Sequence, residues 1–191
     1  MRRFTRISSF LLIGVAAAAC GSPAPPPQAP ATAASNVSAE RGKYIVSTSG
    51  CHDCHTPLKM GPNGPEPDMT RALSGHPASE KIEKGPALSG PWMAAMSHTG
   101  TAWSGPWGIS YTANLTPDRN NGIGIWTEDM FLRAIREGKH MGTSRPILPP
   151  MPWQVYRNLT DDDLKSVFAY LQTVPPIANR VPDPIIVEPK K

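Results

Sequence analysis

The amino-acid sequence predicts an all-α domain whose helices are accompanied by a long Gly/Pro-rich loop excursion. Apolar residues recur at helical spacing in three segments, near residues 38–49, 127–138 and 160–171. A serine or threonine stands at the start of each segment, where its hydroxyl can cap a helix. Between residues 56 and 126 the chain is rich in glycine and proline and has no clear periodicity. We therefore expect this excursion to be irregular chain wrapped on a helical core.

The first predicted helix begins after Ser38, which supplies the N-cap, and runs to about Ser49. Its apolar residues are Tyr44, Ile45 and Val46. It ends immediately before a pair of cysteines, so we expect it to position whatever those cysteines bind.

The other two predicted helices have stronger start signals. Thr127 is followed by two acidic residues, which favour the positive end of a helix, and Gly138 supplies the stop. Thr160 is followed by three aspartates, and a proline pair at 175–176 ends that helix. We interpret the aspartates as helix-capping residues and not as a metal site.

The chain divides into four predicted parts. Residues 1–19 have a positive start, an apolar stretch and small residues before a cysteine, which is the plan of a signal peptide. Residues 20–37 form a Pro/Ala-rich tether, because this composition cannot bury an apolar face. Residues 38–184 are the size of one domain, and residues 185–191 form a C-terminal tail.

The run Ala17-Ala18-Ala19-Cys20 resembles the lipobox of bacterial lipoproteins. In such proteins the leader is cut before the cysteine, and the sulfur receives a diacylglycerol. We therefore predict an exported protein anchored by lipid on the periplasmic side of a bacterial membrane. The alternative is ordinary cleavage after Ala19, which would leave a free thiol on a soluble periplasmic protein.

Charge argues against nucleic acid as a partner. The whole chain has a formal net charge of +4, but residues 1–19 contain three arginines and no acid. The remainder has 16 basic and 15 acidic side chains, a net charge of +1. It has no basic stripe of the kind that follows a phosphate backbone.

The central motif is Cys51-His52-Asp53-Cys54-His55. Two thiols at this spacing can bond the two vinyl groups of one porphyrin, and the following histidine can ligate the iron. A thioredoxin-like redox pair would need a βαβ context, which we do not find. A zinc site would need a second pair of ligands, and the only other cysteine of the chain's three is Cys20. The motif therefore predicts one covalent haem c, held by Cys51 and Cys54 with His55 as an axial ligand.

Met151 is the predicted second axial ligand. It lies among Pro149, Pro150 and Pro152, which restrict the backbone and lower the entropy lost when the loop is ordered. A stiffened loop can hold a weak thioether ligand on iron, and a thioether raises the reduction potential. The neighbouring Trp153 is expected to cover the haem edge.

Four alternatives to ligation by Met151 stay open on the sequence. Met141 follows the middle helix directly, and His140 beside it could produce a bis-histidine haem. Met151 could also merely pack against the core. An open axial position would suit a gas sensor or a haem enzyme instead of an electron carrier.

Taken together, these motifs resemble class I cytochrome c, and in particular bacterial periplasmic mono-haem cytochromes with a P-P-M-P-W distal loop. The resemblance covers about residues 38–184. Besides the cysteine motif, it rests on four segments of this chain: Asn114–Asp118 (N-L-T-P-D), Gly122–Glu128, Arg145–Trp153 and Leu159–Leu171.

The resemblance implies a fold of cytochrome c-like helices around one covalent haem. The first and last helices would then cross at Gly42 and Tyr170. Side chains of the excursion would donate hydrogen bonds to the haem propionates, with Trp107, Tyr111, Asn114 and Arg145 as candidates. The carbonyl of Pro86 would orient the axial histidine.

The function predicted in this way is electron transfer by a periplasmic redox carrier that is not itself an enzyme. Its partners would be a dehydrogenase as electron donor, an oxidase or another cytochrome as acceptor, and a membrane through the lipid anchor. Relatives of this kind also occur as haem subunits of membrane-bound dehydrogenases, which is the main alternative. A haem enzyme or gas sensor with a labile distal ligand is the other.

Overall fold

The computed structural model describes residues 36–187. The predicted signal peptide, Cys20 and most of the predicted tether lie outside these residues. No helix of the described part is long and apolar enough to cross a membrane.

The three predicted helices are confirmed. The structure has α1 (Ala39–Thr48), α3 (Glu128–Glu137) and α5 (Asp161–Leu171). Each begins at the expected cap: the hydroxyls of Ser38, Thr127 and Thr160 accept hydrogen bonds from the backbone N–H three residues later. Two shorter helices, α2 (Cys51–His55) and α4 (Trp153–Tyr156), follow α1 and precede α5 respectively.

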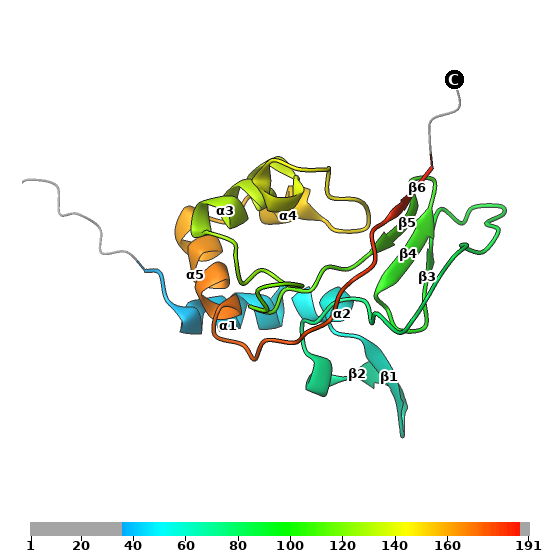
Figure 1. The fold of residues 1–191 in the computed structure, drawn as a ribbon, viewed down its shortest axis with the longest axis horizontal. Helices are drawn as coiled ribbons and strands as arrows, with labels where there is room; N and C mark the ends of the chain where they lie inside the picture. Colours follow the sequence, from blue (N-terminus) through cyan, green and yellow to red (C-terminus); the bar gives the residue numbers. More distant parts are fainter. Residues whose placement is uncertain (1–35, 188–191) are drawn as a thin grey trace, which may run out of the picture. The chain divides into compact units, whose positions relative to one another are not determined.

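Helices α1 and α5 cross in direct contact, as Figure 1 shows at the blue and orange ribbons. Gly42 permits this approach, because a Cβ there would collide with the backbone carbonyl of Ser166 and lie 2.8 Å from the Cβ of Tyr170. An ion pair between Arg41 and Asp163 joins the same two helices. The crossing expected at Gly42 and Tyr170 is therefore where these helices meet.

The prediction of an all-α domain is wrong. Within residues 36–187 there are five α-helices and six strands, and the strands form two antiparallel sheets. The small sheet pairs β1 (Leu58–Gly61) with β2 (Gly64–Pro67). The larger sheet has the order β3-β4-β5-β6, with bounds Ala95–Met96, Ala102–Gly105, Gly108–Tyr111 and Ile185–Ile186.

Two similar turns explain why the excursion forms hairpins. The sequences Gly61-Pro62-Asn63-Gly64 and Gly105-Pro106-Trp107-Gly108 each join two strands, and their terminal glycines pair across the ladder. Proline sets φ for the second position of a turn, and the glycines at 64 and 108 adopt φ values of +116° and +107°. These segments are thus tight hairpins and not irregular chain.

The last strand, β6, lies in the segment predicted as the C-terminal tail. It pairs with β5, so this part of the chain crosses the molecule from α5 to the larger sheet (Figure 1, red). Two short 3-10 helices complete the described elements: Met69–Arg71 follows β2, and His140–Gly142 follows α3.

The hydrophobic core lies between α1, α3 and α5. Two buried residues of the excursion, Leu73 and Ile123, belong to the same cluster. The helical members of the core are Ile45, Val46, Phe131, Ile135, Leu164, Val167 and Leu171. The excursion therefore completes the core as well as surrounding it.

Candidate functional site

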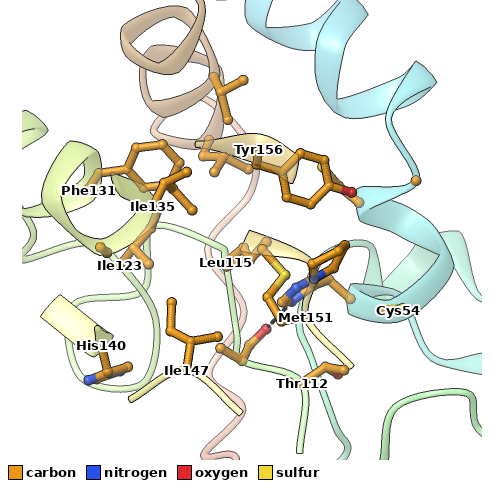
Figure 2. Close-up of a pocket in the computed structure, with 18 of the residues that line it drawn as sticks. Cys54, Thr112, Leu115, Ile123, Phe131, Ile135, His140, Ile147, Met151 and Tyr156 are labelled. Atoms are coloured by element: carbon orange, nitrogen blue, oxygen red, sulfur yellow. Dashed lines mark hydrogen bonds between the residues drawn. The ribbon is translucent and has the colours of Figure 1, made fainter. Parts of the chain in front are cut away.

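The main cavity of the described chain adjoins this core and has a volume of about 190 Å³. That is more than ten times the roughly 10–15 Å³ that one water needs. Its walls come from α1, α2, α3, α5, strand β5 and the loop of residues 147–152 before α4, called the proline loop below. Figure 2 shows an apolar group on one side, made by Ile123, Phe131 and Ile135, with Met151 and Cys54 nearby.

The structure brings the principal predicted site residues to this cavity. Cys51, Cys54, His55 and Met151 all line it. They come from two segments about a hundred residues apart in the chain, the short helix α2 and the proline loop. The cavity thus brings together two thiols, an imidazole and a thioether in a mainly apolar lining, which suits an apolar group that binds thiols and needs ligands for a metal.

Helix α2 positions the cysteines. It begins at Gly50, which adopts φ +74°, and this left-handed residue ends the first helix and lets the second start in a new direction. Both thiols are free, and burial raises the pKa of Cys51 to about 11. Burial also raises the pKa of Cys54, as does the nearby carboxylate of Asp53. A nucleophilic cysteine pair needs a lowered pKa, so these values argue against the thioredoxin-like alternative.

His55 is buried, with 8% of its surface exposed. Its Nδ1 lies 2.8 Å from the carbonyl oxygen of Ala113, which can only accept, so Nδ1 carries the hydrogen and Nε2 is left as the nitrogen that can ligate a metal. Burial lowers the pKa of His55, although the Ala113 hydrogen bond opposes this shift. The imidazole is therefore neutral and oriented, as an axial ligand requires.

This bond corrects the prediction for Pro86. Pro86 is exposed and lines a second, smaller pocket together with residues of β3, β4 and β5, and His55 is not among the residues that line that pocket. The carbonyl that orients the histidine belongs to Ala113, 58 residues after it. A backbone carbonyl has no side-chain signature, so sequence reasoning had no means to select it.

The loop that carries Met151 is fixed at several points. Ser110 on β5 donates a hydrogen bond to the carbonyl of Pro149 at 2.5 Å, and Met151 itself packs against the core. On the other side, the hydroxyl of Tyr156 donates to the carbonyl of Ser49 at 2.5 Å. Ser49 lies two residues before Cys51, so Tyr156 links the Met151 loop to the start of α2. Sequence reasoning missed both Ser110 and Tyr156.

Of the remaining predicted site residues, Tyr111 and Arg145 line the cavity. The Tyr111 hydroxyl, however, donates to the carbonyl of Ile82 at 2.8 Å. Burial lowers the pKa of Arg145, while Asp183 opposes that shift.

The structure does not bring the other predicted contacts to the cavity lining. The Trp107 indole nitrogen donates to Ser110, so it supports the Met151 loop indirectly. Trp153 packs against Gly138 at the end of α3 and is not among the lining residues. Asn114 is buried and binds only backbone and Thr116. Of the two rival ligands, His140 lines the cavity and Met141 does not.

Sequence comparisons find cytochrome subunits of dehydrogenases among the proteins similar to this chain. A fructose dehydrogenase cytochrome subunit from Gluconobacter japonicus is 30% identical over 136 residues, which is 71% of this chain and 21% of that protein. The cytochrome c subunit of a quinone-dependent alcohol dehydrogenase from Gluconobacter oxydans is 29% identical over 148 residues, covering 75% of this chain and 23% of that subunit. The comparisons support a c-type cytochrome.

A third relative is a nicotinate dehydrogenase subunit from Pseudomonas putida, 29% identical over 143 residues, which is 75% of this chain and 9% of that protein. The chain thus spans less than a quarter of the length of these relatives. No protein-family model matches it. The names of the cytochrome subunits imply haem c, and they agree with the predicted role in electron transfer alongside redox partner proteins.

Proposed function

We propose that the chain transfers electrons through one haem c bonded to Cys51 and Cys54, with His55 and Met151 as axial ligands. The observation that carries this proposal is that one apolar cavity is lined by all four of these residues. The hydrogen bond from His55 Nδ1 to the carbonyl of Ala113, which leaves Nε2 available to a metal, is further support.

When bound, haem c supplies a one-electron couple between Fe(II) and Fe(III). The chain's residues would hold the group and set its environment. The cysteines would attach it, His55 would present Nε2, and Met151 would present a soft sulfur. The apolar side chains of α1, α3 and α5 would limit water around the group, which would disfavour extra charge on the metal and raise the potential.

The direct test is a reduced-minus-oxidised absorption spectrum of the exported protein, combined with its intact mass. We expect a c-type spectrum and a mass increase of one haem that survives denaturation. The matched variant Cys51→Ser with Cys54→Ser should lose covalent haem altogether. A colourless wild-type protein with the mass of the bare chain would overturn the proposal.

A second candidate is a haem subunit of a dehydrogenase, which the names of the relatives favour. In this form the chain would accept electrons from a fixed catalytic subunit instead of diffusing between donor and acceptor. Affinity purification from the native membrane under mild detergent separates the two. Stoichiometric recovery of a dehydrogenase subunit would support a fixed subunit, and recovery of the chain alone would support a mobile carrier.

A third candidate is a haem enzyme or gas sensor in which Met151 is a labile ligand. It makes a distinct kinetic prediction: carbon monoxide would bind the untreated reduced protein rapidly. An electron carrier with a firmly ligated thioether should bind it slowly and incompletely.

The membrane location belongs to this proposal too. The leader at residues 1–19 and a diacylglycerol on Cys20 would place the domain on the periplasmic side of a membrane, and residues 20–37 would serve as a tether. The intact mass reports the lipid directly. A Cys20→Ser variant recovered in the soluble periplasmic fraction, with wild type in the membrane fraction, would support the anchor.

A further inference from the structure

Two backbone segments hold His55. The ring Nδ1 donates to the carbonyl of Ala113 at 2.8 Å, and the histidine's own carbonyl accepts from the N–H of Gly75 at 2.8 Å. The two segments also contact each other, because the N–H of His76 donates to the carbonyl of Thr112 at 2.9 Å. A Cβ at Gly75 would lie 2.6 Å from the carbonyl carbon and oxygen of Ala113, so glycine is required for this approach.

The side chain of Asn179 holds the backbone segment that contains Gly75. Asn179 lies on the stretch that follows α5, and its Nδ2 donates to the carbonyls of Ser74 at 2.7 Å and His76 at 2.8 Å. These are the two residues that flank Gly75. The Asn179 Oδ1 accepts from the N–H of Ala78 at 2.9 Å. The amide therefore uses both of its donor hydrogens and its oxygen on one stretch of backbone.

A second asparagine, Asn114, holds the backbone segment that contains Ala113. Asn114 directly follows Ala113 and is 3% exposed. Its Nδ2 donates to the carbonyls of Ile177 at 2.8 Å and Asn179 at 3.2 Å, and its Oδ1 accepts from the N–H and hydroxyl of Thr116 at 2.9 and 2.7 Å. Its full hydrogen-bonding capacity is thus used, which excludes the expected role as a donor to a haem propionate.

We propose that Asn114 and Asn179 are positioning residues for the axial histidine, joining residues 177–179 to both backbone segments that hold His55. The hydrogen bonds of both side chains go to backbone groups and Thr116 and not to the imidazole ring. They act by fixing the carbonyl of Ala113 and the N–H of Gly75, which set the orientation of His55. This inference rests on the proposed function, in which His55 is an axial ligand.

The arrangement has a defined chemical effect. A well-aligned hydrogen bond from Nδ1 raises the basicity of a ligating imidazole. A more basic ligand stabilises the higher oxidation state of a metal. Loosening the carbonyl of Ala113 should therefore weaken this effect and raise the midpoint potential.

The test uses the full-length holoprotein with Asn179→Ala, Asn114→Ala and both together. The readouts are the midpoint potential and the haem methyl resonances in the NMR spectrum of the ferric protein, which report the orientation of the axial histidine. The control is Asn158→Ala. The Asn158 Nδ2 also donates to two backbone carbonyls, those of Gln154 and Val155, but neither belongs to the segments that hold His55.

We expect a positive shift of the midpoint potential and an altered spread of haem methyl resonances in both single variants but not in Asn158→Ala. The double variant should shift less than the sum of the singles, because the two asparagines act on one structure. Asn179 is only half-buried, so Asn179→Ala decides the question if Asn114→Ala fails to fold.

Variants that melt at lower temperature but keep the wild-type potential and resonances would overturn the inference, because the asparagines would then be structural only. That result would leave the proposed function intact. A wild-type protein without haem would instead overturn the proposed function, and this inference with it.

Discussion

The two sides of the cavity hold their candidate ligands in different ways. His55 is buried on helix α2, and its ring is fixed by a carbonyl 58 residues further along the chain. Met151 lies half-buried in a loop between exposed prolines, Pro150 and Pro152. On the histidine side a long-range hydrogen bond reaches the ligand ring itself, whereas on the methionine side the long-range hydrogen bonds reach Pro149 and Tyr156 and not the Met151 side chain. We therefore expect the methionine side to yield first when the protein is perturbed.

Met151→Ala tests this difference most severely. The covalent haem should be retained, because the cysteines and His55 are untouched. The Met-to-ferric-iron charge-transfer band should disappear and the potential should fall, by part of the roughly 0.8 V range that axial ligands span. Absorption spectroscopy and a redox titration measure both. Met96→Ala, at an exposed methionine on β3, is the control. Unchanged spectrum and potential in Met151→Ala would refute the ligand assignment.

Tyr156→Phe perturbs the same side more gently. It removes the hydrogen bond to Ser49 that links the loop to α2, at a cost of about 0.5–1.5 kcal/mol of unfolding free energy. Burial raises the pKa of Tyr156, so the hydroxyl remains a donor at neutral and mildly alkaline pH. Added imidazole should displace Met151 faster in this variant, measured by loss of the charge-transfer band. Equal displacement rates in variant and wild type would mean that the loop does not depend on this bond.

Arg41→Gln should have the smallest effect of the three changes. We expect it to lower the unfolding free energy and to leave the candidate ligands His55 and Met151 unaffected. It breaks the hydrogen-bonded pair with Asp163 at the α1–α5 crossing, and we expect a loss of about 1 kcal/mol in unfolding free energy, since Arg41 is exposed. Spectrum and potential should stay as in wild type. A changed potential would show that the helix crossing is coupled to the site.

The stabilisation that the Arg41–Asp163 pair contributes should depend on pH. Burial would raise the pKa of Asp163, but hydrogen bonds from Thr160 and Arg41 outweigh it and hold the pKa below the ordinary 3.8. A lowered folded-state pKa means that the stabilisation is present above pH 3.8 and is lost as the pH falls through the folded value. Denaturant unfolding at neutral pH and at about pH 3 should therefore show a smaller difference between wild type and Arg41→Gln in acid.

The helices could be predicted because their signals are local. A serine or threonine cap, acids in the first turn and apolar residues at helical spacing all lie within about a dozen residues, and the structure places α3 and α5 where these signals indicate. The strands were missed because each is only two to four residues long. Proline and glycine were interpreted as signs of irregular chain, yet the two G-P-x-G turns are hairpin signals in their own right.

The site was predictable to a similar extent. The cysteine motif and the proline-flanked Met151 are each contiguous in sequence, and the structure brings both to one cavity. The residues that orient them are not contiguous with them: Ala113 acts through its backbone, and Ser110 and Tyr156 act on carbonyls of other segments. Asn114 and Trp107 were recognised as hydrogen-bond donors, but their acceptors lie in the protein. Such pairings depend on the fold and have no sequence signal.

The position of Asn179 bears on the order in which the protein matures. A chain is synthesised from its N-terminus, so the cysteine motif is made long before residues 177–179. Asn179 reaches back 103 and 105 residues to the segment beside His55. Until those residues are in place, the backbone segment beside His55 lacks the hydrogen bonds that Asn179 donates. On the proposed function, the orientation of the axial histidine would therefore be completed last, when the C-terminal residues fold onto this segment.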